Sequence, residues 1–115
     1  MRQTGKLDYL ELPAGGGTLD RVKAFYSAAF GWSFTDYGPT YSAFDEGLEG
    51  GFQAEPGEAA PKPLPVLYAE DVEAALAAVE AAGGTVLKPI YAFPGGRRFH
   101  LRDPAGNELA VWSEG

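Results

Sequence analysis

The same order of predicted elements occurs twice along the chain, and this internal repeat limits the fold more than any other feature. Residues 6–54 predict a strand, a helix and three short strands, and residues 64–113 predict the same order again. Residues 55–63 between them are rich in proline and alanine without periodicity, which is typical of a surface linker. Because self-similarity indicates copies of one supersecondary unit, we expect one α+β domain over residues 1–115, made of two βαβββ modules.

Each module contains one amphipathic helix with recognisable ends. Thr18 is a suitable N-cap and Gly31 a suitable stop for the first helix, as Asp71 and Gly83 are for the second. The apolar stripe expected on the first helix consists of Val22, Phe25, Tyr26, Ala29 and Phe30. The stripe expected on the second helix consists of Val72, Ala75, Leu76, Val79 and Ala82.

Short strands follow each helix. They are expected at residues 32–37, 41–46 and 50–55 in the first module and at 85–93, 97–103 and 107–113 in the second. Pro89 and Pro94 limit the length of the strand expected at residues 85–93. The sequence DPAGN joins the last two strands and is typical of a hairpin turn.

Composition excludes several classes of function. Nine basic against sixteen acidic residues give a net charge of -7, whereas phosphate-binding surfaces are basic, so we expect neither nucleic acid nor membrane as a partner. Without cysteine, the chain has no disulfide, thiolate metal site or cysteine nucleophile. No apolar run reaches the length of a signal peptide or a transmembrane helix, so we expect a cytoplasmic location.

Several stretches resemble the vicinal oxygen chelate superfamily, which includes glyoxalase I, bleomycin-resistance proteins and extradiol dioxygenases. They are YLELPA, RVKAFYSAAFGWSF, AEDVEAALAAVEAAGG and GGRRFHLRDPAGNELAVW. The resemblance covers nearly the whole chain. It implies two βαβββ modules whose sheets form a half-open barrel, or cup, with the helices outside. It also implies a homodimer and, in many members, a divalent metal ion in the cup.

The positions where the superfamily often places its metal ligands hold other residues in this chain. The resemblance puts a histidine at Tyr9, a histidine at Leu64 and a glutamate at Ala110. Leucine and alanine side chains have no ligating atom, and tyrosine is an uncommon ligand for zinc or manganese. We therefore expect no metal cofactor in the usual place.

Strand parity indicates which residues line the cup, because alternate side chains point to opposite faces of a sheet. Large apolar residues are assigned to the helix-covered side: Leu10, Leu12, Leu67, Phe99, Leu101, Leu109 and Val111. The side chains left to bind a ligand in the cup are Tyr9, Glu11, Tyr68, Arg98, His100, Glu108 and Trp112.

His100, the only histidine, is a candidate general acid or base, oriented by Glu11 or Glu108, which would raise its pKa. The alternative, which we favour, is a strand histidine that hydrogen-bonds to a neighbour and has no further role. Glu11 and Glu108 could act together as a carboxylate pair, or each could be the cross-strand partner of Arg98 or Arg102. Arg97 and Arg98 either hold an anionic substrate or form an ordinary basic pair.

These observations favour a glyoxalase-like or bleomycin-resistance-like protein that binds a small, partly aromatic or anionic molecule. The alternative is a lyase, an isomerase or a metal-dependent dioxygenase-type enzyme, with His100 and Glu11 as candidate catalytic residues. A third alternative is a structural protein whose cup is filled by its own side chains.

Overall fold

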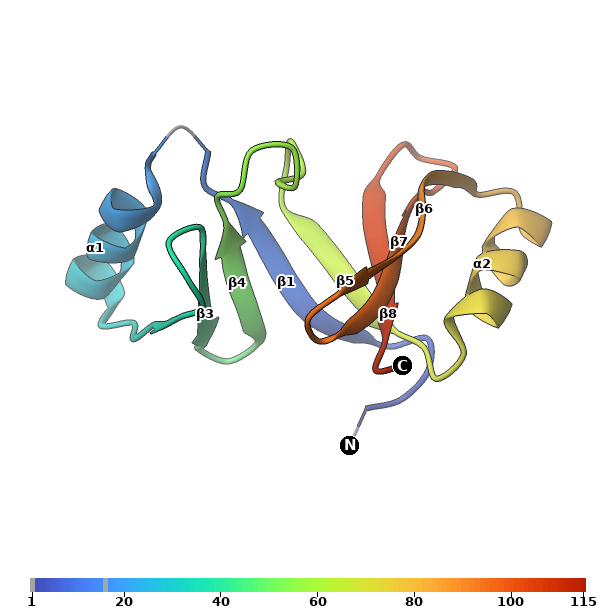
Figure 1. The fold of residues 1–115 in the computed structure, drawn as a ribbon, viewed down its shortest axis with the longest axis horizontal. Coiled ribbons are helices and arrows are strands. Elements are labelled where there is room, and N and C mark those ends of the chain that lie inside the picture. Colours follow the sequence, from blue (N-terminus) through green and yellow to red (C-terminus); the bar gives the residue numbers. More distant parts are fainter. Residues whose placement is uncertain (1, 16) are drawn as a thin grey trace. The chain divides into compact units, whose positions relative to one another are not determined.

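The computed structural model describes residues 2–15 and 17–115. Its contacts divide the chain into two compact units. The first unit covers Tyr9–Leu64, and the second covers Pro65–Gly115 together with the residues up to Asp8. Both units are drawn in Figure 1, which colours the chain from blue at its beginning to red at its end.

The first unit contains one helix and a small mixed sheet. Its elements are the part of β1 (Leu7–Pro13) from Tyr9 on, α1 (Leu19–Phe30), β2 (Thr35–Asp36), β3 (Tyr41–Asp45) and β4 (Glu49–Gln53). β4 pairs in parallel with β1 and antiparallel with β3, and β3 pairs antiparallel with β2. The strand predicted at residues 32–37 was too long, because only Thr35 and Asp36 pair with β3.

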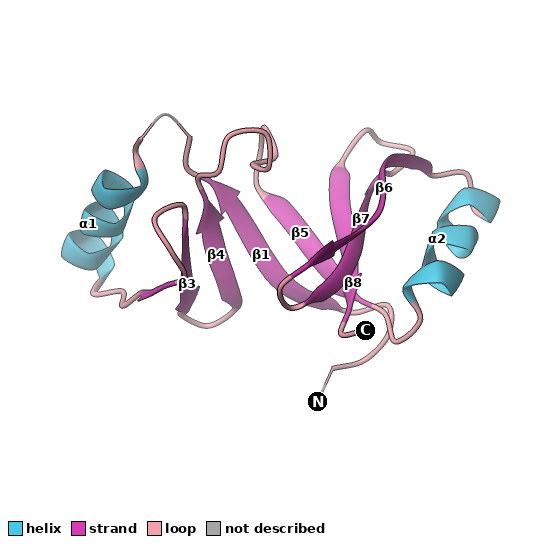
Figure 2. Cartoon of the chain, viewed as in Figure 1, coloured by secondary structure: helices cyan, strands magenta, loops and turns pink. Residues whose placement is uncertain are grey.

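The second unit repeats this topology. Its elements are β5 (Leu64–Tyr68), α2 (Val72–Ala81), β6 (Thr85–Phe93), β7 (Gly96–Arg102) and β8 (Glu108–Ser113). β5 pairs in parallel with β8, and β6, β7 and β8 form an antiparallel meander (Figure 2). The predicted α+β fold with two βαβββ modules is thus confirmed.

Each unit has its own apolar core between its helix and its strands. In the first, Leu19, Phe44 and Phe52 are buried, and the ring of Trp32 lies 4.7 Å from that of Tyr26 and 4.9 Å from that of Phe44. The core of the second consists of Ala69, Val72, Phe99, Leu101 and Val111, with Leu67, Ala75, Leu76, Val79, Ile90 and Leu109 packed against it. The parity prediction for β5, β7 and β8 is therefore confirmed.

The stripe predicted on α1 is partly wrong. Val22 and Tyr26 pack on the first core, but Phe25 is 58% exposed and Phe30 is 66% exposed. Phe25 directly precedes Tyr26, and its side chain points about 100° away from that of Tyr26 around the helix axis. This takes Phe25 outside the narrow buried face. Phe30 is the last residue of the helix, and Gly31 follows it in the left-handed conformation. Ala29 on α1 and Ala82 after α2 are also exposed.

The helix starts differ in their capping. Asp71 accepts a hydrogen bond of 3.0 Å from the Ala74 amide, as predicted for an N-cap. Thr18 makes no such bond to α1, and its hydroxyl donates instead to the Gly15 carbonyl. No helix among the described residues is long and apolar enough to span a membrane.

Candidate functional site

The turn between β7 and β8 fixes the register of the strands that carry the candidate residues. The Asp103 carboxylate accepts hydrogen bonds from the amides of Ala105 and Asn107 at 2.8 and 2.9 Å and from the Asn107 side chain at 3.0 Å. These hydrogen bonds hold the pKa of Asp103 below its usual value, and the bond from the Asn107 side chain has the largest effect. Gly106 adopts φ 90°, a conformation that favours glycine. The resulting register places His100 opposite Ala110.

His100 lies at the centre of a polar cluster on the face of the sheet opposite α2. Its side chain is fully buried. Its Nδ1 lies 2.8 Å from Oε2 of Glu108, and its Nε2 lies 3.0 Å from the hydroxyl of Tyr91. The structure thus brings together two of the predicted residues, His100 and Glu108, and adds Tyr91.

The expectation of a raised pKa at His100 was wrong. Burial, which disfavours the charged imidazolium, is the largest cause and lowers the pKa of His100 below 6.5. The hydrogen bond to Glu108 acts in the opposite direction but is the smaller effect, and the charges of Arg98 and Lys88 lower the pKa further. His100 is therefore a neutral imidazole at pH 7.

The partners of a neutral imidazole define the direction of each hydrogen bond. A carboxylate only accepts, so the His100 Nδ1 carries the hydrogen that points to Glu108. The Nε2 is then an acceptor, and the Tyr91 hydroxyl donates to it. The Tyr91 oxygen in turn accepts a hydrogen bond from Nε of Arg98. The four side chains form one polarised chain from Arg98 to Glu108.

The strand β6, which carries Tyr91, contains two irregularities in its pairing with β7. Lys88 lies opposite His100 and Tyr91 lies opposite Arg98, so three steps along β6 correspond to two along β7. A first shift lies between Val86, opposite Leu101, and Lys88, so the two shifts together leave Ile90 on the core side and Tyr91 on the side of His100. Pro89 lies within the bulge, on a strand that pairs only with β7, where a missing amide hydrogen is tolerated. Sequence reasoning missed Tyr91, although a proline inside a strand signals such a bulge.

Aromatic rings continue this face beyond Arg98. The guanidinium carbon of Arg98 lies 5.6 Å from the ring centre of Tyr91 and 5.8 Å from that of Phe93. The ring of Trp112 lies 6.2 Å from that of Phe93 and 5.5 Å from that of Tyr68. Arg98, Tyr68 and Trp112 were predicted as ligand-binding residues, whereas Phe93 was not. We call Tyr91, Phe93, Arg98 and Trp112 the aromatic–arginine face.

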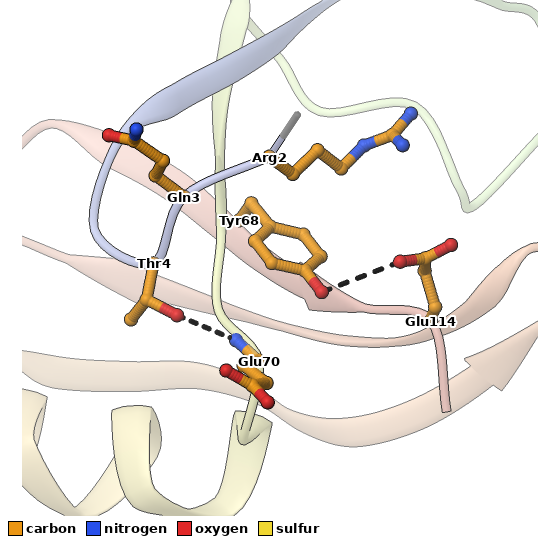
Figure 3. A pocket seen from close by; sticks show the side chains of 6 residues that line it. All are labelled: Arg2, Gln3, Thr4, Tyr68, Glu70 and Glu114. Carbon is orange, nitrogen blue, oxygen red and sulfur yellow. Dashed lines mark hydrogen bonds between the residues drawn. The ribbon is translucent and has the colours of Figure 1, made fainter.

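A shallow hollow of about 630 Å³ lies beside Tyr68 (Figure 3). It is lined by Arg2, Gln3, Thr4, Tyr68, Glu70 and Glu114. The Tyr68 hydroxyl donates to Glu114 at 3.4 Å, and the Glu70 amide donates to Thr4 at 2.9 Å. The hollow is open and polar, and His100 is not among its lining residues. We therefore consider it separately from the His100 cluster, which we take as the candidate site.

The remaining predicted residues, Tyr9 and Glu11, lie in the first unit. Glu11 is only 3% exposed, and its carboxylate accepts a hydrogen bond of 3.4 Å from Tyr41. The Tyr41 hydroxyl also pairs with that of Tyr9. A Cβ atom on Gly51 would collide with both hydroxyls, so glycine is needed for this approach. Tyr41 was not predicted.

Arg97 serves a structural contact. Its guanidinium forms an ion pair with Glu73 of α2, and its Nε donates to the Gly115 carbonyl at 3.0 Å. Arg98 points to Tyr91 and Phe93 instead, because adjacent strand residues face opposite sides. Of the two arginines considered for an anion, only Arg98 therefore lies on the candidate face.

The residues at the superfamily's usual metal positions do not fit a divalent ion. Leu64 and Ala110 are fully buried, and their hydrocarbon side chains offer no lone pair. Ala110 lies between Val66 of β5 and His100 of β7 in the strand register. Within residues 2–15 and 17–115, histidine, aspartate and glutamate side chains form no cluster of three or more that could hold a metal.

Comparison with solved structures identifies proteins of similar fold. A protein from Legionella pneumophila described as an NAD-dependent benzaldehyde dehydrogenase has a TM-score of 0.73 at 15% identity, covering 92% of this chain and 99% of its own. Methylmalonyl-CoA epimerase from Mycobacterium tuberculosis has a TM-score of 0.73 at 11% identity, covering 99% and 91%. At such low identity the likeness establishes the fold and not the activity.

A third similar structure carries the family description itself. It is a glyoxalase/bleomycin resistance protein/dioxygenase superfamily member from Vibrio splendidus 12B01, with a TM-score of 0.69 at 13% identity, covering 94% of this chain and 99% of its own. No curated protein matches the chain. The model of the glyoxalase/bleomycin resistance protein/dioxygenase superfamily matches residues 6–111, nearly the full length. The chain belongs to this superfamily.

Proposed function

We propose that this chain binds a compact aromatic anion on the aromatic–arginine face, without a metal ion at the superfamily's usual position. The observation that supports this most strongly is the placement of Arg98 against Tyr91 and Phe93, at 5.6 and 5.8 Å from the ring centres. A guanidinium beside aromatic rings offers a carboxylate charge-assisted hydrogen bonds and offers a ring a stacking surface.

Local contacts must supply the affinity. The net charge of -7 repels an anion at long range, so electrostatic steering does not assist association. Phe93 and Trp112, whose rings lie 6.2 Å apart, provide apolar area for the ring of the ligand. A molecule that carries both a ring and a carboxylate uses both parts of the face, whereas a neutral ring uses only one.

Calorimetry with benzoate and cinnamate, and with benzamide as the neutral counterpart, tests the proposal. We expect the carboxylates to bind and benzamide to bind at least about tenfold more weakly, the loss of one charge-assisted contact. Arg98→Gln should abolish the preference for the carboxylates. Arg102→Gln is the matched control, since Arg102 lies on the same strand and is exposed. Retention of the carboxylate preference in Arg98→Gln would contradict the proposal.

The second part of the proposal concerns the metal. Elemental analysis of protein purified without chelators should find no divalent ion in a fixed ratio to the chain, because Leu64 and Ala110 cannot ligate one. A tightly bound divalent ion at one per chain would overturn this part and favour the metal-dependent alternative.

A further inference from the structure

The contact between Tyr91 and His100 has no role in the binding of an anion by Arg98. A phenol that donates to a neutral imidazole, which is held from behind by a carboxylate, is an arrangement that can remove the phenol proton. We infer that Tyr91 is an activated nucleophile whose oxygen attacks acyl-type electrophiles while His100 takes its proton. This goes beyond ligand binding, because it assigns a covalent reactivity to one oxygen atom.

The geometry assigns a distinct role to each side chain. His100 is fully buried and both of its ring nitrogens are engaged, so it acts through Tyr91. Tyr91, in contrast, is only half-buried, so part of the residue is in contact with solvent. His100 and Glu108 are therefore positioning residues, and Tyr91 is the group that touches the electrophile.

Arg98 supports the same chemistry from the other side. Its Nε donates a hydrogen bond to the Tyr91 oxygen. When that oxygen loses its proton to His100 Nε2, negative charge develops next to the guanidinium and positive charge develops next to Glu108. Both charges then have a partner of opposite sign within hydrogen-bond distance, which lowers the energy of the separated state.

Acetylation by N-acetylimidazole provides the reaction for a test. The Tyr91 oxygen attacks the acetyl carbonyl, a new aryl ester C–O bond forms, and the C–N bond to the imidazole leaving group breaks. The phenol proton moves to His100 and from there to the leaving group through solvent. Tyr37, which is 68% exposed, serves as an internal reference in the same sample.

Peptide mass spectrometry of the labelled protein measures the ratio of acetylation at Tyr91 to that at Tyr37. We expect a ratio above one at pH 7 in the parent protein, although Tyr91 is the less exposed residue. His100→Gln should lower the ratio at least about a hundredfold, the lower range for loss of a general base. Glu108→Gln, which keeps the shape of the carboxylate, should lower it by a smaller factor. A ratio below one, or one unchanged in both variants, would overturn the inference.

The pH profile separates activation from a merely structural role and needs no variant. Labelling of Tyr91 should be nearly flat above pH 6.5, where His100 is already neutral. The charged groups acting on His100 are Glu108, Arg98 and Lys88. A steep rise of Tyr91 labelling from pH 6.5 to 8 contradicts the inference, even if His100→Gln fails to fold.

Discussion

At the scale of single residues, the environment of His100 decides which chemistry is available. Its ring is buried between a carboxylate and a phenol, and burial outweighs the nearby negative charge. The imidazole therefore stays neutral where an exposed histidine would begin to take up a proton. The presence of an acidic neighbour alone is not enough to infer a charged histidine.

The lowered pKa makes folding stability depend on pH in a defined window. The unfolded chain binds a proton at His100 near pH 6.5, whereas the folded chain does so only at lower pH, so stability is lost as pH falls below about 6.5. Urea unfolding between pH 7.5 and 5.5 should show a slope of at most about 1.4 kcal/mol per pH unit from this residue. His100→Gln should lack this part of the slope. Parallel curves for both proteins would show that His100 is not desolvated.

Gly51 is a second residue whose identity the structure explains. It lies opposite Glu11 in the register, and a side chain there would strike the hydroxyls of Tyr9 and Tyr41. We expect Gly51→Ala to lower the free energy of unfolding by about 1–3 kcal/mol, as for other overpacked sites. Gly15→Ala, where a Cβ meets nothing within 4 Å, is the control. Equal losses for the two variants in urea unfolding would refute the steric explanation.

At the scale of secondary-structure elements, alternation along β7 and β8 was sufficient to predict which side chains are buried. Phe99 and Leu101 face the core and His100 faces the other side, because both strands are regular. In β6 the two register shifts cancel, so Ile90 faces the core and Tyr91 the other side, as alternation from Val86 would give. The two shifts depend on pairing with β7, so the sequence alone did not show that Tyr91 would lie within hydrogen-bond distance of His100.

The helices show a similar limit. Periodicity located both helices, but it could not show how much of α1 the sheet covers, since this depends on strands far away in the sequence. Phe25 and Phe30 consequently remain exposed, while Val72 of α2 is fully buried. Apolar residues on a helix define a candidate face, and tertiary packing defines how wide that face is.

Capping offers a direct comparison of the two helices. Asp71→Ala removes the acceptor for the Ala74 amide and should lower the free energy of unfolding by about 1 kcal/mol. Thr18→Ala removes only a hydroxyl bonded to the Gly15 carbonyl, so it should cost less than half of that. Chemical denaturation of both variants measures the difference. A larger loss for Thr18→Ala would mean that the cap of α1 had been misassigned.

At the scale of the whole molecule, repetition of one module explains why the fold could be anticipated. In each module the first strand pairs in parallel with the last, as in β1 with β4 and β5 with β8. The candidate site could be anticipated only in part: His100 and Glu108 followed from parity, whereas Phe93 and Tyr41 did not. The sequence contains no pattern that pairs Tyr41 with Glu11, which lie thirty residues apart.

The oligomeric state is a prediction at this scale. A chain of 115 residues buries a modest core, and the resemblance implies a homodimer. We therefore expect light scattering coupled to size-exclusion chromatography to give about twice the mass of 12.2 kDa. A mass of a single chain across the concentration range would reject the dimer without affecting the assignment of the His100 cluster, whose contacts all lie within one chain.

The state of His100 is the central claim, and its ring nitrogens can be observed directly. Because the chain contains only one histidine, a long-range ¹H–¹⁵N correlation spectrum of labelled protein shows a single imidazole. We predict a neutral ring at pH 7 with the hydrogen on Nδ1 and a bare Nε2, and a midpoint of protonation that lies below pH 6.5. A charged imidazolium at pH 7, or a neutral ring with its hydrogen on Nε2, would contradict this prediction.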